Sequence, residues 1–198
     1  SDGELAFLRG MIHQRCGETL EAHDSYRLAM KLMAKDDPGL SIGGAEVSFR
    51  GIAGLGALST VSAVARVKEY EAVWLDRVKE LARATSDAFE QMASQLTDRR
   101  YIRKWGEQSL LPPRYLSAAM NYRLAGQAAG QSLVLPDRDN RLQRISGRLE
   151  DCWIAIEESR DLGDSRASIE YLRQLTGAEL AALPSGGPSG MLAGNAET

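Results

Sequence analysis

The sequence is poor in the residues that build covalent, metal-bound or catalytic sites. Among its 198 residues there are only two cysteines and two histidines. Cys16 and Cys152 lie far apart and no CxxC pair occurs, so we expect two free thiols in a reducing compartment, the cytoplasm, rather than a disulfide framework. No CxxC or HxxxH spacing supplies zinc ligands. We therefore expect no metal site and no cofactor.

The sequence also has no apolar run long enough to cross a bilayer. Its most apolar stretch, residues 51–65, has about 15 residues, whereas a spanning helix needs about 20. We expect a buried loop and helix start there, and no stable membrane span. The formal net charge is -3, which argues against general attraction to nucleic acid or acidic membranes. Because the sequence begins without methionine, we also expect a processed or trimmed N-terminus.

Motifs for catalysis and nucleotide binding are missing as well. No GxSxG nucleophile motif occurs, and both histidines lie within the first 23 residues. Gly51, Gly54 and Gly56 follow the order GxxGxG rather than GxGxxG, and no lysine followed by serine or threonine completes a phosphate-binding loop. We therefore expect a protein that is not an enzyme.

What is present favours helices. Alanine, leucine, glutamate and arginine are abundant, and the length fits one domain with a flexible end. We expect an all-α fold, with helical hairpins packed around a long central helix, in a single domain over residues 1–183. Residues 184–198 are mostly glycine, proline, serine and alanine, which predicts a disordered tail.

Glycine and proline divide the predicted domain. Six glycines in residues 39–58 predict a connector. Residues 59–99 contain neither glycine nor proline, which predicts one long helix or two nearly continuous ones. Its apolar stripe includes Trp74 and Leu81, which pack within the chain or between copies of it. Residues 114–183 predict further helical hairpins. The first of these helices, over residues 114 to about 133, has a face of small residues: Ala118, Ala119, Ala125, Gly126, Ala128, Ala129 and Gly130.

The first hairpin has small and aromatic residues at regular places. Leu5, Phe7, Leu8, Met11 and Ile12 recur at helical offsets in its first helix. Small residues at Gly10, Ala22 and Ala29 let the two helices touch, Gly17 suits the turn, and Tyr26 fills the space beside the next helix. In these positions residues 3–34 resemble a tetratricopeptide repeat. Arg9 and Ala34 depart from the family, which usually has leucine and proline there.

The resemblance implies stacked hairpins and a groove that binds another protein. It implies that the first helix presents Phe7, Met11, Gln14 and Arg15 to a partner, with Glu4 beside them. The alternative is that Phe7 and Met11 are ordinary core residues. We expect a non-catalytic adaptor, chaperone or assembly subunit.

Two other functions remain open. Residues 99–105 combine Arg99, Arg100, Arg103 and Lys104 with Tyr101 and Trp105. Basic residues interleaved with aromatics can bind nucleic acid or another phosphate polymer, although cations at a helix end also fit the helix dipole. The other alternative is a structural subunit that forms a homo-oligomer through the long helix.

Overall fold

The computed structural model describes residues 1–64, 71–98, 111–131 and 138–158. Within these ranges the fold is all-α apart from one small β-hairpin, as predicted. The helices are α1 (Asp2–Cys16), α2 (Thr19–Leu32), α3 (Phe49–Val64), α4 (Glu71–Thr97), α6 (Leu111–Gly130) and α7 (Arg138–Glu158). The hairpin consists of β1 (Leu40–Ile42) and β2 (Ala45–Val47), paired antiparallel with Leu40 opposite Val47.

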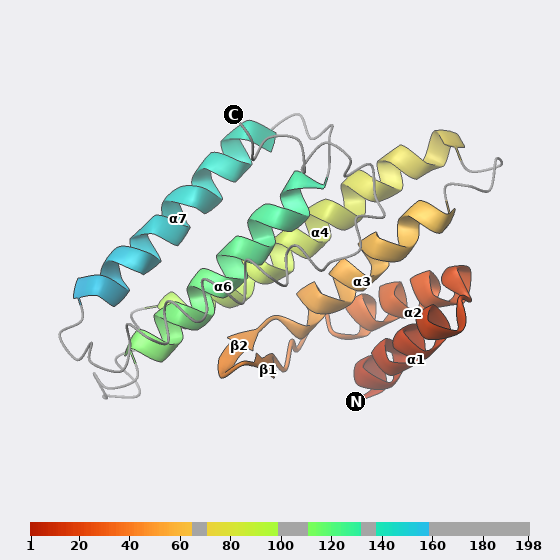
Figure 1. The fold of residues 1–198 in the computed structure, drawn as a ribbon, viewed down its shortest axis with the longest axis horizontal. Helices are drawn as coiled ribbons and strands as arrows, with labels where there is room; N and C mark the ends of the chain where they lie inside the picture. The colour runs from red at the N-terminus through yellow and green to blue at the C-terminus, as the bar shows by residue number, and fades with distance from the viewer. Residues whose placement is uncertain (65–70, 99–110, 132–137, 159–198) are drawn as a thin grey trace.

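The helices are stacked in the order in which they occur in the chain (Figure 1). Each packs chiefly against its neighbours: α1 on α2, α2 on α3, α3 on α4, α4 on α6 and α6 on α7. The β-hairpin contacts α6 through β2. Helices α1 and α7 therefore form the two ends of the described part of the molecule.

Small residues close the first hairpin. Helix α1 buries Gly3, Ala6 and Gly10. A Cβ atom on Gly10 would lie 2.7 Å from the Tyr26 ring, and one on Gly56 of α3 would lie 2.9 Å from the same ring. Tyr26 thus lies between α1 and α3, and it fills the space beside the next helix as expected. Gly17 ends α1 with a φ of 78°, a left-handed conformation that glycine adopts without strain.

The second half of the predicted glycine-rich connector belongs to a helix. Residues 40–47 form the β-hairpin, but α3 begins at Phe49 and includes Gly51 and Gly54. A Cβ on Gly51 would lie 2.5 Å from the Phe89 ring of α4, and one on Gly54 would overlap Thr85 of α4. These glycines let two helices approach closely, and that contact offsets their poor helix propensity.

Of the two forms predicted for residues 59–99, the single long helix is not observed, and the described residues belong to two helices. Residues 59–64 complete α3, and α4 begins at Glu71 and packs back against α3. The structure therefore has two helices in contact here, with residues 65–70 outside the described ranges.

A polar clamp fixes the start of α3. The Ser48 hydroxyl accepts a hydrogen bond from the Gly51 amide at 2.9 Å, and the Asp37 carboxylate accepts one from the Phe49 amide at 2.9 Å. The buried side chain of Asn121 on α6 accepts from the Ser48 amide at 3.0 Å and donates to the Glu46 carbonyl at 2.8 Å. This side chain satisfies two backbone groups of the loop, so it joins the β-hairpin and α3 to α6.

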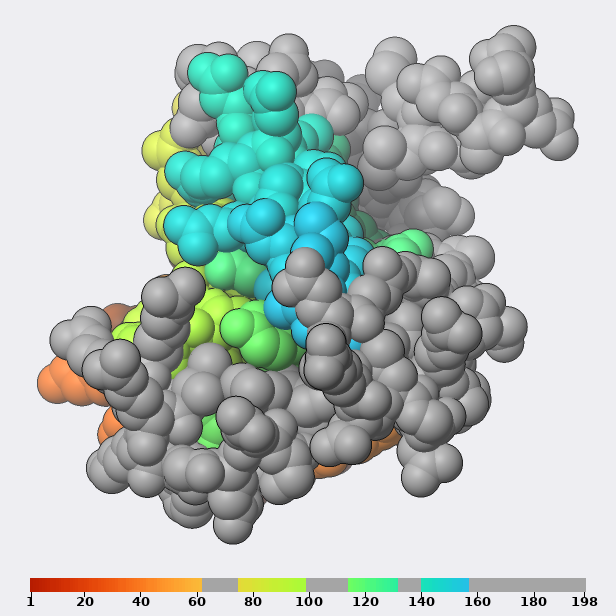
Figure 2. Space-filling view, turned by 90° about the vertical axis from the view of Figure 1, so that its left-hand side faces the viewer, coloured from red at the N-terminus to blue at the C-terminus, as the bar shows by residue number. Residues whose placement is uncertain are grey.

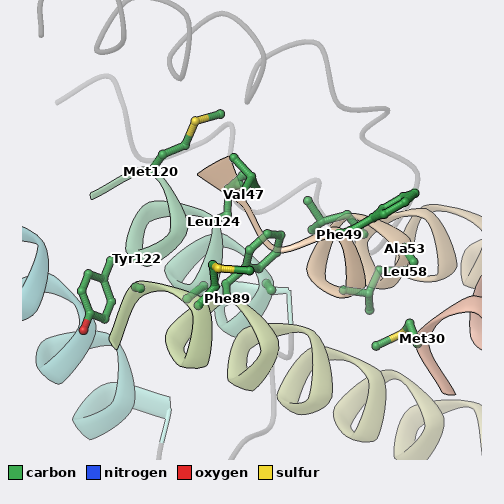
Figure 3. Packing of buried hydrophobic residues seen from close by; sticks show 14 of the residues in the cluster. Met30, Val47, Phe49, Ala53, Leu58, Phe89, Met120, Tyr122 and Leu124 are labelled. Atoms are coloured by element: carbon green, nitrogen blue, oxygen red, sulfur yellow. The ribbon is translucent and has the colours of Figure 1, made fainter. Parts of the chain in front are cut away.

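The apolar core lies where α3, α4, α6 and β2 meet. Phe89 of α4 is fully buried and lies among side chains of these elements, including Val47 and Leu124 (Figure 3). The small-residue face predicted for residues 114–133 is largely confirmed, because the alanines of α6 are buried at its contacts: Ala118, Ala119, Ala125, Ala128 and Ala129.

Helix α7 covers α6 and α4 at one end of the stack (Figure 2). Its Arg141 side chain is only 8% exposed and forms ion pairs with Asp87 and Glu90 of α4. It also donates to the Ser86 hydroxyl at 3.3 Å, and that hydroxyl donates to the Ala125 carbonyl of α6 at 3.0 Å. Arg144 pairs with Glu90 at 3.0 Å from an exposed position. This network joins three helices through side chains.

The predicted helices beyond residue 158 and the predicted tail over residues 184–198 lie outside the described ranges. Across the residues that are described, every helix is too short or too polar to cross a membrane.

Candidate protein-binding site

The outward side of α1 carries a row of exposed apolar side chains. Leu5 is 61% exposed, Leu8 52% and Ile12 61%. Their offsets of three and four residues place them on one side of the helix. Gly3, Ala6 and Gly10, which face the interior, lie on the other side. We call Leu5, Leu8 and Ile12 the outer face of α1.

Exposed apolar side chains are concentrated on the first hairpin. Leu28 and Leu32 are both 47% exposed and lie one turn apart on α2. In the described part of the chain, the large apolar side chains classed as exposed are Leu5, Leu8, Ile12, Leu20, Leu28 and Leu32 on α1 and α2, and Leu75 and Ile154 elsewhere. Single exposed leucines are normal on a protein surface, whereas a grouped set often marks a contact site.

Two of the residues predicted to bind a partner take part in internal packing. Phe7 is half-buried, and its ring centroid lies 5.6 Å from that of Tyr26 and 4.9 Å from that of Phe49. Met11 is also half-buried against the core. Both residues therefore help to join α1 to α2 and α3, which agrees with the alternative reading of them as core residues.

The two predicted polar contacts have different surroundings. Gln14 accepts a hydrogen bond from the Tyr26 hydroxyl at 2.7 Å and donates to the Ser59 hydroxyl at 3.5 Å. Arg15 is exposed and follows Ile12 by three residues and Leu8 by seven. Its position thus extends the outer face of α1 with a positive charge.

The sequence prediction placed Leu5, Leu8 and Ile12 in the same stripe as Phe7 and Met11. The structure divides this set between two sides of α1. The small residues were the decisive signal, because Gly3, Ala6 and Gly10 recur at offsets of three and four and allow close contact with α2. A helix that packs through glycine and alanine leaves its leucines on the opposite side.

The residues of the two alternative functions are only partly described. Arg99, Arg100, Arg103 and Lys104 lie outside the described ranges, as does the side chain of Trp74. Leu81 is 7% exposed and buried within the chain. Leu81 is therefore not presented to a second copy, contrary to the expectation for an interface through this helix.

The sulfur and imidazole groups lie in contrasting environments. Cys16 is exposed and Cys152 is buried, where desolvation and the neighbouring Asp151 raise the thiol pKa of Cys152 to about 11. His13 contacts the Glu18 carboxylate at 2.5 Å, whereas His23 is buried between α2 and α3. In the described ranges, no group of three or more histidine, cysteine, aspartate or glutamate residues is placed to hold a metal ion.

Comparisons of the chain with protein-family models, with curated proteins and with solved structures find no match.

Proposed function

We propose that this protein is a non-catalytic binding module that contacts another protein through the outer face of α1. The observation that carries the proposal is the row formed by Leu5, Leu8 and Ile12, each more than half exposed on the end helix of the stack. Figure 1 shows α1 at that end. A partner helix or groove that covered this row would bury apolar surface that water now surrounds.

Burial of this row can supply part of the free energy of association. Full burial of one leucine or isoleucine side chain is worth about 1.5–3 kcal/mol, and these three begin about half exposed. Arg15 at the end of the row adds a charge that can select an acidic partner surface. Phe7 and Met11 support the face from within by fixing α1 on its neighbours.

The tetratricopeptide resemblance of residues 3–34 supports the same function by analogy. Proteins built from stacked helical hairpins present extended binding surfaces, although a fold alone does not determine function. An adaptor, chaperone or assembly subunit fits this proposal. Two free thiols in the described structure fit a reducing compartment such as the cytoplasm.

Two sets of variants test the proposal. Leu8→Glu with Ile12→Glu places charges on the outer face of α1, and Ile154→Glu places one at an exposed apolar position on α7 as a matched control. We expect affinity capture with the wild-type chain to recover a defined partner that the outer-face variant loses and the control keeps. Recovery of the same proteins by all three chains would refute the proposal.

Light scattering on a sizing column tests whether the partner is a second copy of this chain. A monomer at all concentrations indicates a different protein as partner. An oligomer that dissociates in the outer-face variant, but persists in Ile154→Glu, indicates self-association through α1. An oligomer that persists in both variants would place the subunit contact elsewhere and contradict the proposal.

A further inference from the structure

A second feature of the structure, separate from the outer face of α1, is a positively charged cavity between α2, the start of α3 and α4. Its volume is about 170 Å³, and its lining includes Arg27, Lys31, Arg50 and Arg77 but only one carboxylate, that of Glu80. Four cations and one anion give this lining a net charge of +3, in a chain whose formal net charge is -3. We call it the cationic cavity.

Arg50 is the cation in this cavity with an unsatisfied buried donor. Its side chain is half-buried, and its Nε atom is buried without a hydrogen-bond partner. A buried donor that lacks an acceptor is costly, and the cost is greater for a charged group. Arg50 also lines the cavity, so part of its guanidinium is within reach of a ligand there.

The carboxylate of Asp37 bonds the backbone near Arg50 and not its guanidinium group. Asp37 accepts hydrogen bonds from the backbone amides of Gly39, Phe49 and Arg50 and from the Ser48 hydroxyl. Its charge is thus directed to the start of α3, where helix amides favour a negative group. Within the described ranges, the side chains of Arg27, Lys31 and Arg50 form no ion pair with Asp37 or with Glu80.

The cations of this cavity also affect the pKa of a nearby buried histidine, His23. Burial is the main cause that lowers the pKa of His23, and the charges of Arg27 and Arg77 lower it further. Asp24 acts in the opposite direction, as does the hydrogen bond to the Ala57 carbonyl. Arg27 from α2 and Arg77 from α4 thus both disfavour the protonated form of His23.

The lining of the cavity also has an apolar part. Met30 and Leu81 line it and are 6% and 7% exposed. Apolar walls lower the local dielectric constant, so a charge in the cavity interacts more strongly than it would in open water. A water molecule needs only about 10–15 Å³ of such space, so the cavity can hold one small oxyanion with several waters.

From this geometry we propose that the cationic cavity binds a phosphate group, with the half-buried Arg50 guanidinium as one contact and the exposed Arg27 and Lys31 at the rim. Guanidinium groups present planar pairs of donors that match phosphate and carboxylate oxygens. The lining has an excess of three positive charges, which matches a phosphate of charge about −2 better than a carboxylate of charge −1.

The experiment is a titration of the full chain with inorganic phosphate at fixed pH and ionic strength, followed by calorimetry. Phosphoserine with blocked termini and acetate are titrated in parallel. The test variants are Arg50→Gln and the pair Arg27→Gln with Lys31→Gln, which lies at exposed positions and preserves the fold if Arg50→Gln does not. The control is Arg148→Gln, which removes an exposed arginine from α7. Circular dichroism verifies that each variant is folded.

We expect saturable binding of one phosphate, weakened about tenfold or more by either test variant and less than twofold by Arg148→Gln, because one charge-assisted hydrogen bond corresponds to about that factor. We also expect bound phosphate to raise the pKa of His23, seen by NMR of its ring, since the two equilibria are linked. The outer-face variant of α1 should bind phosphate normally, which separates this proposal from the proposed function.

Other outcomes have defined meanings. Absence of saturable binding, equal affinity in the test variants, or acetate binding as tight as phosphate binding overturns the proposal. Tighter binding of blocked phosphoserine than of phosphate supports it and assigns the phosphate to a phosphorylated side chain. Equal or weaker binding supports it with a free phosphate or a small phosphorylated molecule as the ligand.

Discussion

His23 is a neutral histidine enclosed by the protein. It is 2% exposed, and its Nδ1 atom lies 3.0 Å from the Ala57 carbonyl, which can only accept a hydrogen bond. The proton of the neutral ring therefore lies on Nδ1. The other nitrogen, Nε2, is buried without a partner. Protonation would add a donor at Nε2 with no acceptor, in a place where Arg27 and Arg77 already repel positive charge.

This environment predicts that the protein loses stability in mild acid. The pKa of folded His23 is lowered, first by burial. Between the folded and the unfolded pKa, His23 is therefore protonated in the unfolded chain but neutral in the folded chain. The stabilisation is complete above the unfolded pKa of about 6.5, and it falls by about 1.4 kcal/mol per pH unit below that value until the folded pKa is reached. Urea unfolding between pH 7.5 and 5 measures the loss.

The control for this prediction is His23→Asn. Its amide nitrogen can still donate to the Ala57 carbonyl, but it does not titrate. We expect the free energy of unfolding of the variant to depend less on pH over the same range. Equal slopes for both chains would mean that other groups cause the acid sensitivity.

At the scale of elements, glycines of α3 lie at its contact with α4. A Cβ atom on Gly54 would overlap the Thr85 side chain, whereas Gly147 in the middle of α7 has nothing within 4 Å of the same position. The two glycines thus occupy similar places in their helices but opposite packing environments. The difference separates the effect of packing from that of helix propensity.

Alanine at these positions should change stability in opposite directions. We expect Gly54→Ala to lower the free energy of unfolding by about 1–3 kcal/mol, because α3 must move away from α4. We expect Gly147→Ala to raise it by about 0.5–1 kcal/mol, the difference in helix propensity. Chemical denaturation of both variants measures these changes. An increase in the free energy of unfolding of both variants would show that the contact between α3 and α4 can accommodate a methyl group at Gly54.

The attachment of α7 provides a second matched pair. Arg141 and Arg144 both pair with Glu90, but the Arg141 side chain is 8% exposed and that of Arg144 is 58% exposed. We expect Arg141→Ala to cost about 1–3 kcal/mol, because it removes the buried guanidinium that pairs with Asp87 and Glu90 and donates to the Ser86 hydroxyl. We expect Arg144→Ala to cost less than about 0.5 kcal/mol, as for an exposed pair. Equal losses in denaturation curves would contradict this difference in burial.

The elements differ in how well the sequence predicts them. The first hairpin could be predicted closely, because Gly17 marks a helix end that local chemistry alone determines. The start of α3 could not be predicted, since glycine usually interrupts a helix. Gly51 and Gly54 are helical here, where they pack closely against Phe89 and Thr85. The clamp by Asn121 joins residues more than 70 positions apart, and no local pattern indicates it.

At the scale of the whole molecule, the stacking of helices in sequence order means that inner helices pack against more neighbours than end helices do. Helix α4 packs on both α3 and α6, whereas α1 packs chiefly on α2 and has one side in water. We expect native-state hydrogen exchange to protect amides of α4 and α6 most and those of α1 least, because end helices open locally at a smaller cost. The same exchange free energy in all helices would show that they open as one unit.

The two candidate sites could be identified only from the arrangement of the helices in the whole molecule. The sequence shows that α1 carries both apolar and small residues, but only its position at the end of the stack shows which side water reaches. The cationic cavity combines Arg27, Arg50 and Arg77, which are separated by more than 20 positions each and come from three helices. Such sites depend on the fold and leave no contiguous motif.

The order of the stack also has a mechanical consequence. Since each described helix is held chiefly by the helices next to it in the chain, a force that pulls α1 away from α7 meets the contacts one after another. The molecule would then lengthen in steps, each releasing one helix at modest force. A β-sheet pulled along its strands instead loads many hydrogen bonds at once. A force applied between α1 and α7 would therefore extend this protein gradually.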